Sequence, residues 1–153
     1  MHMTATEIEA EAAVRLRAVI GRLSRRLRPT AAGTAAGLTP TRVTVLLDVV
    51  RLGPVGLSEI ANAEGINPTM LSRVISDLVD AGLLERGHDE RDRRSAWVKA
   101  TPAGRRLAER MRRERTQAVD LALAELTARQ REAVHAALPA LEALAEQLRG
   151  GLR

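Results

Sequence analysis

The length and composition of the chain restrict the kind of protein that it can be. It has 153 residues, of which 45% are hydrophobic and 28% charged, values that are ordinary for a globular protein of one domain or two small ones. No run of about 18 apolar residues is free of charges, and no apolar stretch follows a basic start, so neither a transmembrane helix nor a secretory signal is predicted. The chain contains no cysteine, which excludes disulfides and cysteine nucleophiles. We expect a cytoplasmic protein.

The charge balance favours a polyanionic partner. Twenty-four Lys and Arg residues against nineteen Asp and Glu residues give a formal net charge of +5, and Lys99 is the only lysine. A basic protein attracts nucleic acids or anionic membranes, although a general coding bias toward arginine would produce the same excess. Trp97 is the only aromatic residue, which disfavours single-stranded nucleic acids because they are bound by stacking on several aromatic rings.

The first half of the chain is predicted to be helical. Apolar residues at steps of three or four predict a helix over residues 6–28, and Pro29 ends it. A loop of small residues is expected over 29–38. Thr39-Pro40, a capping residue followed by proline, begins the next helix, which ends before Gly53-Pro54.

The second half combines helices with one small β element. A short helix from Leu57 ends at Gly65, and Asn67-Pro68 begins a further helix that ends at Gly82. Strands over residues 83–86 and 95–100 enclose a polar turn, which predicts a hairpin.

Two long helices are predicted after the hairpin. Thr101-Pro102 begins one that runs to about Glu125, and Leu126-Thr127 begins another over residues 128 to about 149, which Pro139 is expected to kink. The predicted class is mostly α, or α+β.

Residues 57–80 have the pattern of a helix-turn-helix unit. Ala61 is small where the two helices meet, Gly65 tolerates a positive φ in the turn, and Ile66 is an apolar plug. In such units the first turn of the second helix contacts base edges in the major groove. The predicted DNA-contacting residues on this helix are Asn67, Thr69, Met70, Ser72 and Arg73.

The hairpin that follows makes this unit a winged helix. Wing arginines enter the minor groove of DNA, and the predicted ones are Arg91, Arg93 and Arg94. Four arginines and four acids lie between Glu85 and Arg94, so a salt-bridged surface hairpin is the alternative. In the favoured interpretation, Asp89 or Asp92 orients one arginine and leaves Arg91 or Arg93 free.

Three segments together resemble the multiple antibiotic resistance regulator (MarR) family of winged helix-turn-helix regulators. They are Asp89–Ser95 (DERDRRS), Val98–Gly104 (VKATPAG) and Leu78–Arg86 (LVDAGLLER). Ala100 departs from the usual leucine, and Met70 stands where a small polar residue is more usual. The resemblance implies a homodimer whose two winged helices bind a palindromic operator in double-stranded DNA.

In that assignment residues 1–38 and 116–153 are dimerisation helices, and residues 39–115 form the DNA-binding region. The terminal helices are also more apolar than such a small DNA-binding core can bury, with an intramolecular bundle as the alternative. The apolar residues that need a partner surface are Leu121, Leu126, Val134, Leu138, Leu141, Leu144 and Leu148.

The resemblance also implies a repressor that releases DNA when a small anionic or phenolic ligand binds. Arg22, Arg25 or Arg26 is a candidate partner for a ligand carboxylate; solvent or DNA phosphates are the alternatives. The run Arg105–Arg115 is expected to be a solvated helix face.

Other function classes receive less support. His2, His88 and His135 are scattered, so no metal site is predicted, and no cofactor or catalytic constellation is recognised. We therefore expect no enzyme. The remaining alternatives are a sequence-tolerant DNA-organising protein and a bundle that binds only other proteins.

Overall fold

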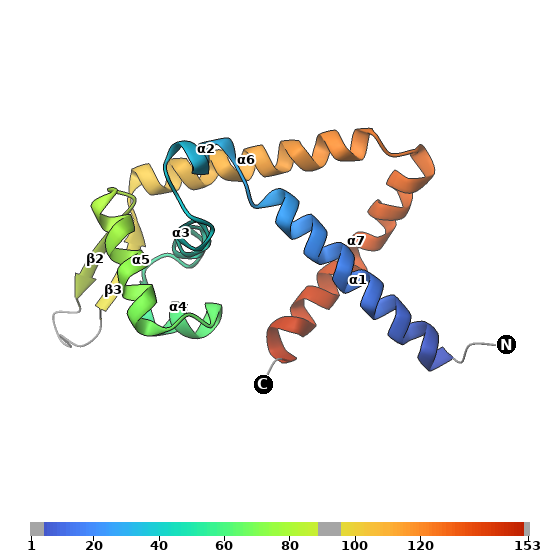
Figure 1. The fold of residues 1–153 in the computed structure, drawn as a ribbon, viewed down its shortest axis with the longest axis horizontal. Coiled ribbons are helices and arrows are strands. Elements are labelled where there is room, and N and C mark those ends of the chain that lie inside the picture. Colours follow the sequence, from blue (N-terminus) through green and yellow to red (C-terminus); the bar gives the residue numbers. More distant parts are fainter. Residues whose placement is uncertain (1–4, 89–95, 152–153) are drawn as a thin grey trace. The chain divides into compact units, whose positions relative to one another are not determined.

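A computed structural model describes residues 5–88 and 96–151 (Figure 1). The described chain forms two compact units that divide between Arg115 and Thr116, and one helix runs from the first unit into the second. The elements of the first unit are, in chain order, α1 (Ala5–Leu27), α2 (Ala31–Ala35), α3 (Pro40–Leu52), β1 (Val55–Gly56), α4 (Leu57–Glu64), α5 (Pro68–Asp80), β2 (Leu84–His88), β3 (Ala96–Ala100) and the first half of α6 (Pro102–Ala124). The fold is mostly helical with one small sheet, as predicted.

Apolar side chains from α3, α4, α5, the sheet and α6 form one core in the first unit. Its fully buried members include Leu46 of α3, Ile60 of α4, Ile75 of α5, Val98 of β3 and Met111 of α6. Helices α3, α5 and α6 bury residues spaced three or four apart, which is the periodicity of a helix with one apolar face. The core therefore fixes α5 and the sheet to a common base.

Three of the four predicted capping residues start helices of the first unit. The hydroxyl of Thr39 accepts a hydrogen bond from the Arg42 amide at 3.4 Å. The side-chain oxygen of Asn67 accepts one from the Thr69 amide at 2.9 Å. The hydroxyl of Thr101 accepts one from the Gly104 amide at 3.1 Å. Such bonds satisfy backbone amides that have no partner within the helix.

The sheet has three antiparallel strands in the order β1-β3-β2. Two differences from the sequence prediction appear here. β1 was not predicted, and its two residues pair Val55 with Val98 and Gly56 with Trp97. β2 starts one residue later than predicted and extends to His88. A two-residue strand has no periodicity of its own, so only its pairing with β3 defines it.

The short helix α2 lies in the segment that was predicted to be a loop. Thr30 caps it by accepting a hydrogen bond from the Gly33 amide at 3.1 Å. The Ala32 amide donates to the Glu114 carboxylate of α6 at 3.1 Å. The prediction was wrong because the five small residues of α2 have no apolar periodicity, and one of the contacts that hold the helix comes from a residue 82 positions away.

The second unit comprises the end of α6 and all of α7 (Ala128–Gly151), which continues through Pro139 as one helix. Thr127 caps α7 as predicted, since its hydroxyl accepts from the Gln130 amide at 3.3 Å. The Arg131 guanidinium donates to the carbonyls of Ala124 and Leu126, at 3.3 and 2.5 Å, where α6 ends. These bonds define the turn between α6 and α7.

Candidate nucleic-acid interface

The turn between α4 and α5 has the geometry that the sequence predicted. Gly65 adopts φ 61° and ψ 28°, the left-handed conformation that glycine reaches without steric cost. The Ile66 amide then donates to the Ala61 carbonyl at 3.1 Å, and Ile66 packs against the core. Ala61 is buried beneath the turn. The angle between α4 and α5 is thus held by packing and by a backbone hydrogen bond.

The start of α5 is exposed on the face opposite the core. Leu71, Val74, Ile75 and Leu78 point inward. Because side chains around a helix repeat every 3.6 residues, the remaining positions of the first two turns face solvent. Asn67, Thr69, Met70 and Arg73 are all exposed, and Met70 exposes 51% of its surface.

Ser72 differs from the other predicted contacts because it is half-buried. Its carbonyl accepts from the Ser76 hydroxyl at 3.0 Å and from the Arg86 guanidinium of β2 at 3.5 Å. Arg86 therefore links the first strand of the hairpin to α5. Sequence reasoning counted Arg86 only as one of the wing's charges and missed this contact.

Strands β2 and β3 form the stem of the wing. They pair from Leu84↔Ala100 to His88↔Ala96. On one face, Glu85 and Lys99 form an ion pair at 3.0 Å, and the Lys99 ammonium lies 5.4 Å from the centre of the Trp97 ring. Trp97 and Val98 point to opposite faces, as predicted, because Val98 is fully buried and Trp97 only half-buried.

Gly87 provides the space that the Trp97 ring occupies. A Cβ atom at position 87 would lie 2.0 Å from Cζ2 of Trp97, far inside van der Waals contact. Only glycine fits opposite this ring. The sequence placed Gly87 in the turn, and no local signal indicated that it faces the indole.

The predicted tip of the wing lies outside the described residues. This applies to Arg91, Arg93 and Arg94, and equally to Asp89 and Asp92. The structure brings the start of α5 and the stem of the wing together on one core, and it leaves the predicted contacts of the wing tip untested.

Thr101 connects the wing stem to α6. Its hydroxyl donates to the Gly82 carbonyl at 2.7 Å and accepts from the Gly104 amide at 3.1 Å. Its own amide donates to the Leu83 carbonyl at 3.1 Å. The end of α5, the base of the hairpin and the start of α6 are thereby joined at one residue.

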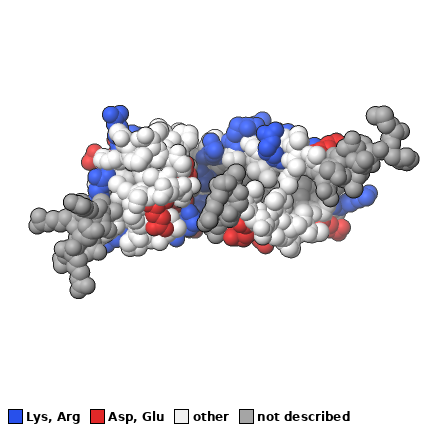
Figure 2. Space-filling view, turned by 90° about the horizontal axis from the view of Figure 1, so that it is seen from below, with Lys and Arg blue, Asp and Glu red and all other residues white. Residues whose placement is uncertain are grey.

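Charged residues are distributed around this unit. In Figure 2, most of the face of the winged-helix body is uncharged, and Lys and Arg side chains lie mainly at its margin. Among the described residues, Arg73 forms no ion pair. Uncharged surface suits contacts with bases, and cations at the margin suit contacts with phosphates.

A cavity of about 440 Å³ lies beside α3 in the same unit. The residues that line it are Ser24, Leu27, Arg28, Val43, Thr44, Leu47, Asp48, Glu64 and Arg115. Two of its polar atoms, Oδ2 of Asp48 and Nε of Arg115, are buried without a hydrogen-bond partner. Buried polar atoms are normally paired, so these two atoms mark a place where a further polar group fits.

The acidic end of this cavity contains a carboxyl group whose pKa is raised, that of Glu64. Partial burial raises the pKa of Glu64 above its ordinary value of 4.5, and a hydrogen bond with Asp48 and the charge of Asp48 raise it further. Arg51 opposes the shift and forms an ion pair with Asp48 at 2.9 Å.

The arginines at the cavity differ from the predicted ligand partners. Arg28 and Arg115 line it, whereas Arg22, Arg25 and Arg26 do not. The Arg115 guanidinium donates to the Arg28 carbonyl at 3.4 Å, which holds the side chain at the cavity wall.

Within residues 5–88 and 96–151, no three or more His, Asp or Glu side chains are grouped as metal ligands. Nor does this part of the chain contain a helix long and apolar enough to cross a membrane.

The α4–turn–α5 unit followed by a paired hairpin defines a winged helix-turn-helix protein of the DNA-binding regulator class. The family model for MarR matches residues 38–96. The uncharacterized HTH-type transcriptional regulator YwhA of Bacillus subtilis is 27% identical over 88 residues, which are 58% of this chain and 63% of YwhA. The match thus spans somewhat less than two thirds of that relative.

Solved structures of other proteins have the same fold over nearly the whole length of this chain. A Pseudomonas aeruginosa PA01 protein is 30% identical, with a TM-score of 0.74 over 90% of this chain and 96% of that one. A mutant Staphylococcus aureus MepR bound to an oligodeoxyribonucleotide is 16% identical, with a TM-score of 0.62 over 88% of this chain and 97% of MepR. The match to the family model assigns the winged-helix region, residues 38–96, to the MarR family of transcriptional regulators.

Proposed function

We propose that this protein is a homodimeric, sequence-specific DNA-binding repressor that releases a palindromic operator when a small anionic or phenolic ligand binds. The observation that carries the proposal is the exposed start of α5, held beside the wing stem by the Ser72–Arg86 contact. That combination presents a helix to the major groove and a hairpin to the neighbouring minor groove. We expect the protein to act in the cytoplasm.

The proposed base contacts come from α5. Thr69, Met70 and Arg73 project from its exposed face, Asn67 caps its start, and Ser72 is half-buried beside Arg73. The wing contributes Arg91, Arg93 and Arg94 to the minor groove. The oligodeoxyribonucleotide bound to MepR supports DNA as the ligand of this fold.

The proposed dimer interface uses residues 1–38 and 116–153. Apolar side chains on α1 and α7 stay exposed within one chain, among them Ile20 at 46%, Leu23 at 56%, Leu138 at 44% and Leu148 at 55%. Rows of exposed large apolar residues mark a surface that another protein covers. A second copy places two winged helices at a fixed separation, which corresponds to a palindromic site.

The proposed ligand site is the cavity beside α3. The unpartnered Nε of Arg115 suits a carboxylate or phenolate oxygen, and the unpartnered Oδ2 of Asp48 suits a hydroxyl donor. An anionic aromatic compound with a hydroxyl group satisfies both atoms. Arg28 and Arg115, rather than Arg22, Arg25 and Arg26, are therefore the proposed basic partners.

Selection of bound duplexes from a random pool tests this function. The expected result is one palindromic sequence with half-sites about one helical turn apart, and weaker retention when hydroxylated aromatic acids are added. Uniform recovery of all sequences indicates the DNA-organising alternative. No recovery at low salt contradicts DNA binding altogether.

A further inference from the structure

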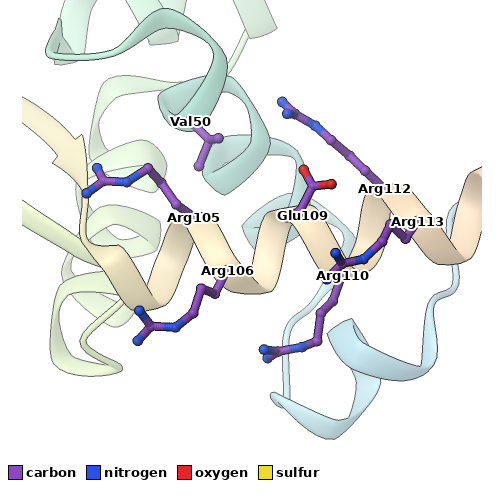
Figure 3. Close-up of a pocket in the computed structure, with 7 residues that line it drawn as sticks. All are labelled: Val50, Arg105, Arg106, Glu109, Arg110, Arg112 and Arg113. Atoms are coloured by element: carbon purple, nitrogen blue, oxygen red, sulfur yellow. The ribbon is translucent and has the colours of Figure 1, made fainter.

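A group of arginines on α6 lies outside both the proposed operator contacts and the proposed ligand cavity. Five of them line an open hollow of about 520 Å³, together with Glu109 of the same helix and Val50 of α3. We call this surface the α6 arginine patch; it consists of Arg105, Arg106, Arg110, Arg112 and Arg113. Figure 3 shows Arg106 and Arg110 extending to one side of α6 and Arg112 to the other, where Glu109 and Val50 lie.

The patch carries positive charge that the described chain does not neutralise. None of its arginines takes part in an ion pair among the described residues. Arg105 donates to the Ala100 carbonyl at 2.6 Å, and all five side chains are exposed. Neighbouring guanidinium groups on the same side of α6, such as those of Arg106 and Arg110, repel one another, so an anion that binds between them is favoured.

The spacing of the patch suits an extended anion. Arg106, Arg110 and Arg113 follow one another at steps of four and three residues, which places them in one row about 10 Å long. The hollow is open, and within the described residues it has no aromatic lining. A small ligand needs enclosure on most sides, whereas a line of phosphates is bound by a row of cations through counterion release.

The patch is separated from the proposed operator contacts. Thr101, just before α6, is hydrogen-bonded to Gly82 at the C-terminal end of α5, while the proposed base contacts lie at the N-terminal end. The 13 residues of α5 separate these ends by about 20 Å. In the view of Figure 1, α4 and α6 lie on opposite sides of α3.

We propose that the α6 arginine patch binds the phosphate backbone of a second DNA duplex while the winged helix holds the operator. A duplex is the favoured occupant because phosphate contacts need no aromatic stacking. A protein already bound to DNA also meets neighbouring duplex at high local concentration. The inference rests on DNA binding by the winged helix, and the experiment therefore measures the two events separately.

The experiment is a two-duplex capture with the full-length chain. A duplex selected from the random pool is immobilised and loaded with protein, and the retained protein is quantified. A labelled duplex of the same length and scrambled sequence is then added at about 50 mM salt, and the label captured per protein is measured. The wild-type protein is expected to capture label. The triple variant Arg106→Gln/Arg110→Gln/Arg113→Gln is expected to capture at least about tenfold less, with unchanged retention on the first duplex.

Two variants serve as controls. Arg106→Lys/Arg110→Lys/Arg113→Lys keeps the charge and is expected to keep most of the capture. Arg129→Gln/Ala136→Glu/Gln147→Glu lowers the net charge by the same three units at exposed positions of α7 and is expected to capture like the wild type. A loss of capture in this second control would assign the effect to net charge and overturn the proposal.

The other outcomes are also decisive. Absent capture by the wild type, or equal capture by the wild type and the glutamine variant, overturns the proposal. Binding of inorganic triphosphate that depends on the patch, without duplex capture, identifies a small-anion site instead and also overturns it.

If the first duplex retains no protein, the proposed function is contradicted. DNA binding by the α6 arginine patch is then measured on its own. With the scrambled duplex in solution, the glutamine variant is expected to lower the slope of log affinity against log salt by about 2 to 3, at roughly 0.9 per phosphate contact. An unchanged slope overturns the proposal that the patch binds DNA.

Discussion

At the exposed start of α5, Arg73 extends into solvent without an ion-pair partner in the described part of the chain, and Ser72 beside it is half-buried. Arg73 is therefore the longest free donor group at the proposed base contacts. We predict that Arg73→Ala weakens binding to the selected duplex by about 1–3 kcal/mol and reduces discrimination against scrambled DNA. Competition binding measures both effects. Arg129→Ala is the control for lost charge, and wild-type discrimination by Arg73→Ala would contradict the placement of the recognition helix.

The Gly87–Trp97 pair determines how the wing stem is shaped. Because a Cβ at position 87 would lie 2.0 Å from the indole ring, Gly87→Ala is predicted to displace Trp97 and to lower the free energy of unfolding by about 1–3 kcal/mol. Trp97 is the only tryptophan, so its fluorescence reports the displacement directly. Gly56 pairs with Trp97 from the other strand, and a Cβ atom there would meet only Ser58 Oγ, at 3.9 Å. Gly56→Ala is thus the control, and equal effects at both positions would refute the steric explanation.

The raised pKa of Glu64 predicts a pH dependence of stability. A carboxyl group whose pKa is higher in the folded chain than its ordinary 4.5 stabilises the fold at low pH, and that contribution is lost as pH rises through the folded value. Glu64→Gln stays neutral and keeps a donor for Asp48. The melting temperature of the variant minus that of the wild type is therefore predicted to increase as pH rises above 4.5. Thermal melts between pH 4 and 8 measure this difference. Glu59→Gln, on the exposed first turn of α4, is the control. A constant difference across this range would argue against the shift.

At the scale of elements, the joint at Thr101 determines how α6 meets the winged helix. Its hydroxyl bonds the end of α5 and caps α6 at the same time. Thr101→Ala is predicted to destabilise the fold by about 1–2 kcal/mol, measured by urea unfolding. Thr101→Ser keeps the hydroxyl and is expected to recover most of the loss. Equal destabilisation by Ser and Ala would indicate that the methyl group, and not the hydrogen bonds, matters.

For the whole molecule, the exposed apolar row of α7 predicts self-association. Leu138 and Leu141 expose 44% and 40% of their surfaces, and charges at these positions would be buried in a dimer without a partner. Leu138→Glu/Leu141→Glu is predicted to give monomers in sedimentation experiments and to lose high-affinity operator binding.

The other side of the same helix supplies the control. Ala136 and Ala143 are exposed there, and Ala136→Glu/Ala143→Glu is expected to leave the dimer intact. A wild-type chain that sediments as a monomer would contradict the proposed assembly.

Local sequence signals were sufficient to predict every helix except α2, the turn at Gly65 and the caps at Thr39, Asn67 and Thr101. These features depend on residues within about one helical turn of each other, so their signals are local. The same locality made the exposed face of α5 predictable from the spacing of Leu71, Val74 and Leu78.

The features that join distant parts of the chain could not be predicted from local sequence signals. Helix α2 depends on Glu114, and strand β1 on its pairing with β3. Likewise, the cavity brings Asp48 and Glu64 together with Arg115. Such contacts form when the core packs helices from different segments against one another, and residue spacing within a segment holds no information about that packing.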